Sequence, residues 1–540
     1  MLNRFCAVTL LAVAICAPLG AIQQPVKTKG GLVSGVVGKK PGITAFKGIP
    51  FATPPVGNLR WAEPKPAAAW TGVLKAEKFA SSCIQTIVQE RKPWTYEFMT
   101  HNEISEDCLY LNVWTPARSA SQKRPVFVYI YGGGFVEGSG AVPVYDGEGL
   151  SSKGLVVVTF NYRVGILGTL THPELSAESP HHVSGNYGYL DQVAALRWVH
   201  DNIAAFGGDP RRVTIAGQSA GAGSVHALTA SPLARGLFHR AIEESGSSVG
   251  TAPAGNVSAN PLATVEQNGV RFAEAKGAKN LAELRAMRWQ KIVEPVQATA
   301  NTAGGRGGTG FRFGQVVDGY FLTASVAETY AQGKQNDVPE LTGMNANDNN
   351  VASDPKATVS AFKDQAKRRY DDLADAYLKA YSVTSDAQAV DATINSSCDQ
   401  GRVSMYLWAM NRAKTAKTRA FTYYWNHTLP GPDAATYKAF HTSEVPYVLN
   451  TLYVSDRPFT DADHKIADLM SSYWVNFATT GDPNGTGLPH WPAVGEEADT
   501  TMQVGDDPQP ILIADSPAKI EFWKEYFARP RLQAGGRGSL

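Results

Sequence analysis

The sequence has almost no net charge. Its 50 Lys and Arg residues are balanced by 49 Asp and Glu residues, which gives a formal net charge of +1. A chain without an excess of positive charge has no general attraction to polyanions, so we predict no nucleic-acid partner. Because 43% of its 540 residues are hydrophobic, the chain can instead bury a large core.

Long hydrophobic runs are also scarce. The apolar run at residues 5–19 follows Arg4 and is shorter than the roughly 20 residues that a transmembrane helix needs. A basic start followed by a short apolar stretch is typical of a signal peptide, which we expect at residues 1–21. The exact cleavage position stays open. We therefore expect a secreted or periplasmic protein without a stable membrane span.

Cysteine is scarce as well, with five in the whole chain. Cys6 and Cys16 fall within the expected signal peptide, which leaves Cys83, Cys108 and Cys398 in the mature chain. An oxidising compartment allows one pair of these three to form a disulfide. The 11 histidines are scattered rather than set at metal-ligand spacing, so we predict neither a metal nor an organic cofactor.

Short apolar runs that end in glycine or a polar loop recur along the chain and predict buried strands. These runs are residues 126–131, 155–160, 213–216, 241–243, 338–342 and 420–425. Between them lie helical patterns, the clearest at residues 190–206. The alternation predicts an α/β fold with a mostly parallel central sheet flanked by helices.

The chain shows no internal repeat and no long low-complexity linker. We therefore expect one catalytic domain over residues 22–530 and a disordered tail at 531–540. The glycine-rich stretch at 304–310 predicts a mobile loop near the entrance to the site.

Residues Gly217 to Gly221 match the pattern G-x-S-x-G. They follow the predicted strand at 213–216, and residues 222–230 can form a helix. A sharp turn from strand to helix needs small residues on both sides of the serine, so that its hydroxyl stands clear of the sheet. The pattern predicts that Ser219 is a nucleophile.

A second glycine cluster, at residues 132–134, directly follows another predicted strand. Glycines allow successive backbone amides to point at one spot without an intruding side chain. We predict that the N–H groups of Gly133, Gly134 and Ala220 stabilise an oxyanion.

Several longer stretches make the chain similar to one known family. They are Glu-Asp-Cys-Leu-Tyr-Leu-Asn-Val at 106–113, Asn-Tyr-Arg-Val-Gly at 161–165, Gly-Asn-Tyr-Gly at 185–188, Leu-Asp-Gln at 190–192 and Phe-Gly-Gly-Asp-Pro at 206–210. Together with the serine motif, they resemble the type-B carboxylesterase and cholinesterase family of α/β-hydrolases. The resemblance covers nearly the whole mature chain and implies an α/β-hydrolase fold.

The same resemblance implies specific structural contacts. It implies a disulfide between Cys83 and Cys108, which leaves Cys398 as a small buried apolar residue. It also implies two buried ion pairs, and breaking either one would leave an unpaired buried charge. These pairs are Arg60 with Glu106 and Arg163 with Asp191.

The resemblance extends to the remaining catalytic groups, which in these hydrolases follow the order Ser, acid, His. His441, in Phe-His-Thr-Ser-Glu-Val-Pro at 440–446, fits the histidine motif of the family. The acid of the family is a glutamate in G-x-N-x-x-E, whereas this chain has Asp348 at that place. A shorter carboxylate can still orient the imidazole, so we predict Asp348, with Asp354 as the alternative.

Two residues are predicted to support this triad, and two to contact substrate. Gln218 is neutral where cholinesterases carry an acid, which makes a choline ester a poor candidate. Ser245 matches the serine that these enzymes place next to the triad, and we expect it to hydrogen-bond toward it. Arg306 and Arg312 flank the glycine-rich stretch and are suited to binding carboxylates, and the alternative is that both are ordinary solvated loop arginines.

The expected activity is hydrolysis of a small-molecule carboxylic ester through an acyl-enzyme. Bacterial members of the family with similar length and an export signal hydrolyse the tricarballylate esters of fumonisin mycotoxins, so the resemblance suggests a polycarboxylate ester. A general short-chain carboxylesterase or a lipase is the alternative. A non-catalytic binding protein on the same scaffold is the alternative of another class, but such relatives typically lack the nucleophile or the base. The sequence leaves the oligomeric state open.

Overall fold

The computed structural model describes residues 21–246, 262–296, 311, 313–348 and 358–529. Several features expected from the sequence fall outside these residues. They are the signal segment up to residue 20, the glycine-rich stretch with Arg306 and Arg312, the alternative acid Asp354, and the tail at 531–540.

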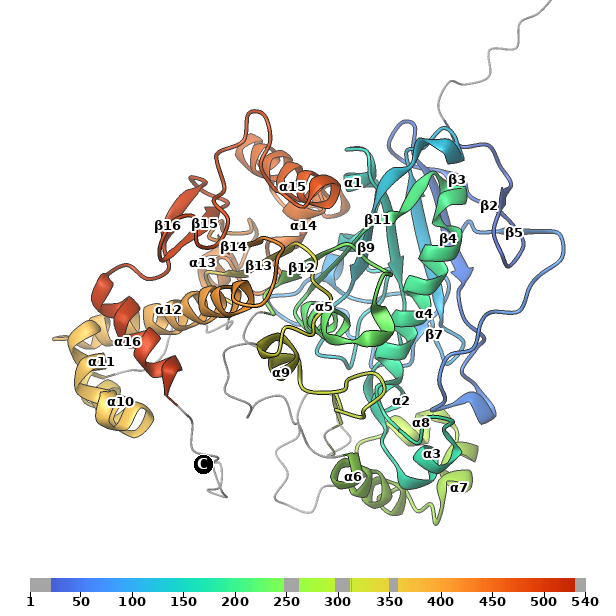
Figure 1. Cartoon of the computed structure of the whole chain (residues 1–540), viewed down its shortest axis with the longest axis horizontal. Helices are drawn as coiled ribbons and strands as arrows, with labels where there is room; N and C mark the ends of the chain where they lie inside the picture. The colour runs from blue at the N-terminus through green and yellow to red at the C-terminus, as the bar shows by residue number, and fades with distance from the viewer. Residues whose placement is uncertain (1–20, 247–261, 297–310, 312, 349–357, 530–540) are drawn as a thin grey trace, which may run out of the picture.

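A mostly parallel sheet forms the centre of the described structure (Figure 1), and eleven strands of the described residues contribute to it. Seven neighbouring strands run parallel to one another: β10, β9, β11, β12, β13, β14 and β15. Antiparallel strands extend the sheet at both edges. In spatial order the strands are β16 Gln509–Leu512, β15 Thr500–Val504, β14 Ala420–Trp425, β13 Glu340–Asn345, β12 Arg240–Glu244, β11 Gly208–Gln218, β9 Arg124–Ile130, β10 Val156–Phe160, β8 Tyr110–Thr115, β4 Thr44–Pro50 and β3 Val36–Val37.

Two small sheets lie outside the central one. The first contains β1 Val26–Lys27, β2 Leu32–Ser34 and β5 Val73–Lys75. The second pairs β6 Ser82–Cys83 with β7 Ile104–Ser105.

The six apolar runs predicted as strands correspond to β9, β10, β11, β12, β13 and β14, which are neighbours in the parallel part of the sheet. Their residues are buried almost without interruption, as all five residues of β10 are. Strands covered on both faces lack the alternation of apolar and polar residues, which explains why continuous apolar runs marked them.

Helices cover both faces of the sheet. Figure 1 shows α4 and α5 on one side and α1 and α15 on the other. The helices are α1 Glu148–Ser151, α2 Gly165–Thr169, α3 Pro173–Glu178, α4 Tyr187–Asn202, α5 Ala220–Ala230, α6 Leu262–Ala275, α7 Leu281–Ala286, α8 Trp289–Val293, α9 Val326–Ala331, α10 Val359–Tyr370, α11 Ala374–Ala380, α12 Asp386–Ala413, α13 Ala434–Tyr437, α14 Val445–Val448, α15 Asp461–Thr480 and α16 Pro517–Ala528.

The residues at the ends of α15 explain where this helix starts and stops. At the start of α15, the side chains of Thr460 and Asp463 bond to each other's backbone N–H groups, which is a capping box. The helix ends at Gly481, whose φ of 84° lies in the left-handed region that favours glycine. The helix predicted at 190–206 is α4, which starts three residues earlier and continues beyond Asn202 as a tighter 3-10 turn.

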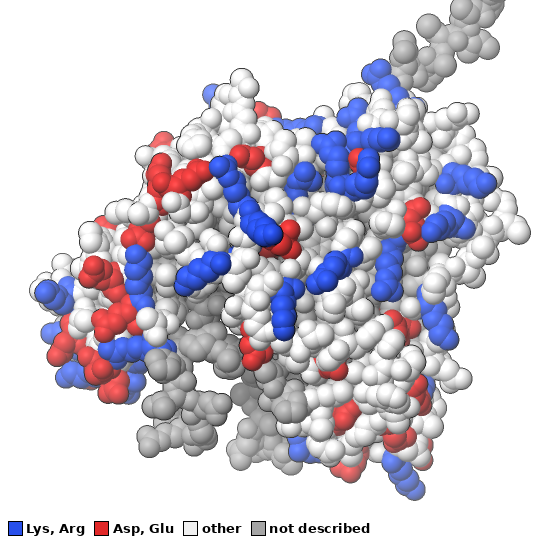
Figure 2. Space-filling model, in the orientation of Figure 1, with Lys and Arg blue, Asp and Glu red and all other residues white. Residues whose placement is uncertain are grey.

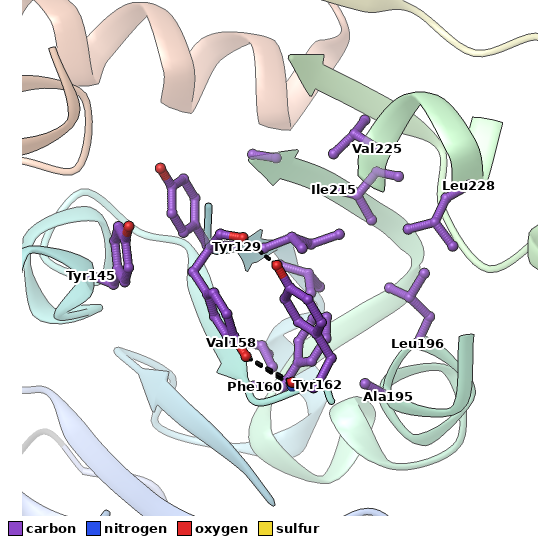
Figure 3. Packing of buried hydrophobic residues seen from close by; sticks show 14 of the residues in the cluster. Tyr129, Tyr145, Val158, Phe160, Tyr162, Ala195, Leu196, Ile215, Val225 and Leu228 are labelled. Carbon is purple, nitrogen blue, oxygen red and sulfur yellow. Dashed lines mark hydrogen bonds between the residues drawn. The ribbon is translucent and has the colours of Figure 1, made fainter. Parts of the chain in front are cut away.

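Aromatic side chains pack the core beside the sheet (Figure 3). The rings of Tyr131 and Tyr162 stack with centroids 4.3 Å apart. Each hydroxyl donates to the backbone carbonyl of the other residue, at 3.0 Å and 2.8 Å. These bonds satisfy two buried polar groups and link the segment after β9 to the segment after β10.

The contacts that the family resemblance implied are present. Cys83 and Cys108 form a disulfide. Arg60 binds Glu106 through two nitrogens at 2.6 Å and 2.5 Å, and Arg163 binds Asp191 in the same way at 2.8 Å and 2.7 Å. Cys398 is mostly but not fully buried, and it differs from a purely apolar residue because its thiol donates to the carbonyl of Ala346 at 2.8 Å.

The surface agrees with the small net charge. On the face drawn in Figure 2, basic and acidic side chains are interspersed. Among the helices of the described residues, none is both long and apolar enough to cross a bilayer.

The Arg163–Asp191 pair yields a stability prediction. Asp191→Asn removes the charge that compensates Arg163, whose side chain is only 4% exposed. An uncompensated buried charge lowers the free energy of unfolding by about 3–5 kcal/mol, which urea denaturation would measure. The control is Asp201→Asn, which breaks an exposed pair with Lys29 and should cost less than about 1 kcal/mol. Equal effects of the two substitutions would contradict the prediction.

Candidate active site

The serine motif forms the sharp turn that its sequence predicts. Strand β11 ends at Gln218, helix α5 begins at Ala220, and Ser219 between them has φ 59° and ψ −120°. This conformation is strained for a residue with a side chain. A Cβ atom on Gly221 would lie 2.0 Å from the carbonyl oxygen of Ile130, so only glycine fits where α5 passes the end of β9. The turn therefore exposes the serine hydroxyl next to the strand that leads into the glycine cluster.

The glycine cluster forms a tight loop directly after β9. The carbonyl of Gly133 accepts the N–H groups of Val136 and Glu137 at 3.1 Å and 3.2 Å. Gly133 has φ 105°, and a Cβ on it would lie 2.2 Å from the carbonyl oxygen of Glu137. Both the backbone conformation and the lack of space therefore exclude a side chain at this position. Gly134 is also left-handed, with φ 64°. On the other side of the serine, Ala220 is the first residue of α5, where backbone N–H groups have no partner within the helix.

His441 and Asp348 lie on loops that follow neighbouring parallel strands, β14 and β13. The Nδ1 atom of His441 is 2.5 Å from a carboxylate oxygen of Asp348. The side chains are 19% and 15% exposed. The two loops are themselves joined, because the N–H of Asn347 donates to the carbonyl of Ala439 at 2.9 Å. The carboxyl edge of the parallel strands thus brings together groups that are 93 residues apart.

Gln218 contacts the opposite edge of the histidine ring. Its side-chain nitrogen lies 3.2 Å from Nε2 of His441, and its oxygen accepts the hydroxyl of Thr442 at 3.3 Å. The residue is 2% exposed. An amide donor at Nε2 and a carboxylate acceptor at Nδ1 together favour the neutral tautomer that carries its proton on Nδ1.

Ser245 does not make the expected hydrogen bond toward these groups. Its hydroxyl is buried and has no hydrogen-bond partner among the described residues. The backbone at Ser245 has φ 53°, and its N–H donates to the carbonyl of Gly343 at 2.8 Å, which together set the direction of the side chain.

A pocket connects the serine, the histidine and the glycine cluster. Its described lining residues are Gln85, Thr86, Val88, Arg91, Trp94, Phe98, Met99, Thr100, Gly132, Gly133, Gly134, Glu137, Gly138, Val142, Tyr145, Gln218, Ser219, His441 and Thr442. Eight of these lie between residues 85 and 100, inside the loop that the Cys83–Cys108 disulfide closes. No sequence motif predicted that this segment lines the pocket. The only indication in the sequence was the implied disulfide between Cys83 and Cys108, which closes the loop that contains it.

Trp94 shows how this segment reaches the histidine. Its indole N–H lies 3.1 Å from the carbonyl of His441 and 3.0 Å from the hydroxyl of Thr442. The tryptophan therefore holds the backbone of the histidine loop from the pocket side.

Two buried glutamates lie beneath the site. The backbone carbonyl of Glu244 accepts the N–H of Ser219 at 2.8 Å, while its carboxyl accepts from Trp474 at 2.8 Å and Tyr129 at 3.3 Å. Burial raises the pKa of Glu244 to about 7 despite these two donors. Burial also raises the pKa of Glu444, and the nearby Glu244 adds to that increase.

The sequence of this chain matches a known protein family. The family model described as "Carboxylesterase family" matches residues 23–523. The chain belongs to the carboxylesterase family. This carboxylesterase therefore has the α/β-hydrolase fold, and it is a carboxylic ester hydrolase.

Curated relatives cover most of the carboxylesterase. It is 39% identical to "Fumonisin B1 esterase" of Sphingopyxis macrogoltabida over 478 residues, which are 86% of this chain and 83% of the relative. It is 33% identical to "Fatty acyl-CoA hydrolase precursor, medium chain" of Anas platyrhynchos, with 96% of each chain covered. It is 32% identical to "Cocaine esterase" of Homo sapiens, with 92% of this chain and 89% of the relative covered.

The buried Glu244 yields a pH prediction for this carboxylesterase. A carboxyl whose pKa is raised from 4.5 to about 7 binds its proton more tightly in the folded state. Its stabilising effect is therefore complete below pH 4.5 and is lost as the pH rises to about 7. In Glu244→Gln this loss is absent, so the stability of the variant relative to wild type should rise by about 2 kcal/mol between pH 5 and pH 8.

Urea denaturation at pH 5, 6.5 and 8 would measure this difference. The variant Glu521→Gln, which changes an exposed glutamate on α16, is the control and should show no comparable trend. The prediction fails if the difference between Glu244→Gln and wild type is constant across the three pH values.

Proposed function

We propose that Ser219, His441 and Asp348 form the catalytic triad of this esterase. The observation that carries the proposal is the contact of 2.5 Å between His441 and Asp348, at a pocket that Ser219 and His441 both line. The strained turn at Ser219 supports it further, because it presents the hydroxyl at the end of the sheet.

In this mechanism Nε2 of His441 accepts the proton of the Ser219 hydroxyl while the serine oxygen attacks the ester carbonyl. Asp348 stabilises the imidazolium that forms. The negative charge on the carbonyl oxygen is stabilised by hydrogen bonds from the N–H groups of Gly133, Gly134 and Ala220. The intermediate collapses to an acyl-serine, and His441 gives its proton to the departing alcohol.

Water completes the reaction by the same steps in reverse. His441 takes a proton from water, the hydroxide attacks the acyl-serine, and the acid leaves as the proton returns to Ser219. Gln218 supports the starting state, because its amide favours the tautomer in which Nε2 carries no proton.

We propose a polycarboxylate ester, such as a tricarballylate ester of the fumonisin type, as the substrate. The support is the 39% identity to a fumonisin B1 esterase over 86% of the chain. In this proposal Arg306 and Arg312 contribute carboxylate contacts from the glycine-rich stretch. A general short-chain carboxylesterase or lipase is the second candidate, and it is favoured by the relatives at 32–33% identity, which are named for a fatty acyl-CoA and for cocaine.

We also propose that the enzyme is exported, with residues 1–21 as its signal peptide. The Cys83–Cys108 disulfide supports this proposal, because disulfides persist mainly in oxidising compartments.

The nucleophile can be tested with an organophosphonate probe. We expect the probe to label wild type once and to leave Ser219→Ala unlabelled, since the alanine has no hydroxyl to phosphonylate. Intact mass spectrometry would detect the adduct, and ester turnover should fall by several powers of ten in the variant. Labelling of Ser219→Ala to the wild-type extent would assign the nucleophile elsewhere.

The acid can be tested by Asp348→Asn. An asparagine can donate to Nδ1, which favours the tautomer with its proton on Nε2, so kcat should fall by several powers of ten. Thermal unfolding would check that the variant is folded. Asp354→Asn is the matched comparison and should retain nearly normal kcat. The opposite pattern, with normal turnover in Asp348→Asn and loss in Asp354→Asn, would reverse the assignment.

A further inference from the structure

Arg91 has a fixed position at the wall of the active-site pocket. Its backbone N–H donates to the carbonyl of Trp94 at 2.9 Å, and the N–H of Trp94 donates back to Arg91 at 2.8 Å. Trp94 in turn contacts the backbone carbonyl of His441. The turn that carries Arg91 is therefore anchored to the loop of the catalytic histidine.

Arg91 is the only lysine or arginine among the described residues that line this pocket. Glu137 is the only acidic side chain among them, and it forms an ion pair with one terminal nitrogen of Arg91. A guanidinium group has five N–H donors on three nitrogens, so one carboxylate oxygen does not saturate it. The side chain of Arg91 is 36% exposed, which leaves part of the guanidinium open to a ligand.

Glu137 affects both the position of the Arg91 guanidinium and the net charge that it presents to the pocket. Its backbone N–H donates to the carbonyl of Gly133, so its carboxylate belongs to the loop proposed to hold the oxyanion. It thus holds the guanidinium at the wall of the pocket that Ser219 and His441 also line. It also neutralises part of the positive charge, which limits the selectivity that Arg91 can supply.

We propose that Arg91 binds a free carboxylate of the substrate and so selects esters of di- and tricarboxylic acids. This inference rests on the proposed function, because it places the carboxylate on the acyl group that Ser219 attacks. A planar guanidinium binds a carboxylate through two parallel hydrogen bonds, which fixes orientation as well as charge. Arg91 is thereby a specificity residue, and the proton transfers remain with His441.

Two esters that differ at one group would test the proposal. In p-nitrophenyl pentanoate the acyl chain ends in a methyl group, and in mono-p-nitrophenyl glutarate a carboxylate replaces that methyl. The measured quantity is the ratio of kcat/KM for the glutarate ester to kcat/KM for the pentanoate ester. We expect Arg91→Gln to lower this ratio about tenfold, which corresponds to about 1.4 kcal/mol.

Three further variants make the result specific. Arg91→Lys should retain part of the ratio, since lysine keeps the charge without the planar pair of donors. Glu137→Gln should raise the ratio, because it removes the competing carboxylate. Lys92→Gln is the matched control: Lys92 pairs with Asp433 and is absent from the described lining of the pocket, so the ratio should match wild type.

Inhibition by free tricarballylate gives a second readout. Its inhibition constant against the pentanoate ester should rise about tenfold in Arg91→Gln and stay unchanged in Lys92→Gln. Thermal unfolding of each variant would confirm that the compared proteins are folded.

The outcomes separate this inference from the proposed function. If wild type hydrolyses the pentanoate ester and Ser219→Ala does not, the catalytic proposal stands. An equal ratio and an equal inhibition constant in wild type and Arg91→Gln then overturn the role of Arg91 alone. If Ser219→Ala hydrolyses both esters as fast as wild type, the proposed function itself fails.

Discussion

The site depends on the close approach between helix α5 and the end of strand β9. Gly221 passes so near the carbonyl of Ile130 that no side chain fits between them. Because Ile130 is the last residue of β9, the same contact sets the distance between the serine turn and the glycine loop that follows. A larger residue at position 221 would separate Ser219, the proposed nucleophile, from the amides proposed to stabilise the oxyanion. One packing constraint therefore positions two parts of the proposed catalytic site.

A second set of contacts holds the loop of Asp348 and the loop of His441 next to each other. The side chain of Asn345, the last residue of β13, donates to the carbonyl of Phe440 at 2.7 Å and also binds the carboxyl of Glu444. These bonds cross from the strand before Asp348 to the segment that contains His441. The two bonds satisfy the amide nitrogen of Asn345 and link the two loops, whereas the amide oxygen of Asn345 and one carboxyl oxygen of Glu444 are buried without a hydrogen-bond partner among the described residues. The carboxyls of Glu244 and Glu444 add a cost that the surrounding packing has to offset.

What could be predicted from the sequence followed from local patterns. The apolar runs identified strands β9 to β14, because both faces of these strands are covered. The serine turn was predictable because its glycines and its flanking elements lie within a few residues of each other. The edge strands β3 and β16 have no fully buried residue, so their sequences carry no comparable signal. The cluster of α10, α11, α12 and α16 joins segments more than 100 residues apart and leaves no local pattern.

The same distinction separates the residues proposed for catalysis from those proposed for selectivity. Ser219, His441 and Asp348 follow strands of the sheet, where the parallel arrangement brings them together whatever the substrate. Arg91 and Trp94 belong instead to a loop held by a disulfide at its ends and by contacts to the histidine loop in its middle. This loop lies outside the central sheet, so its side chains can change without altering the strands that carry the proposed triad. We therefore expect relatives with the same reaction and different substrates to differ mainly in this segment.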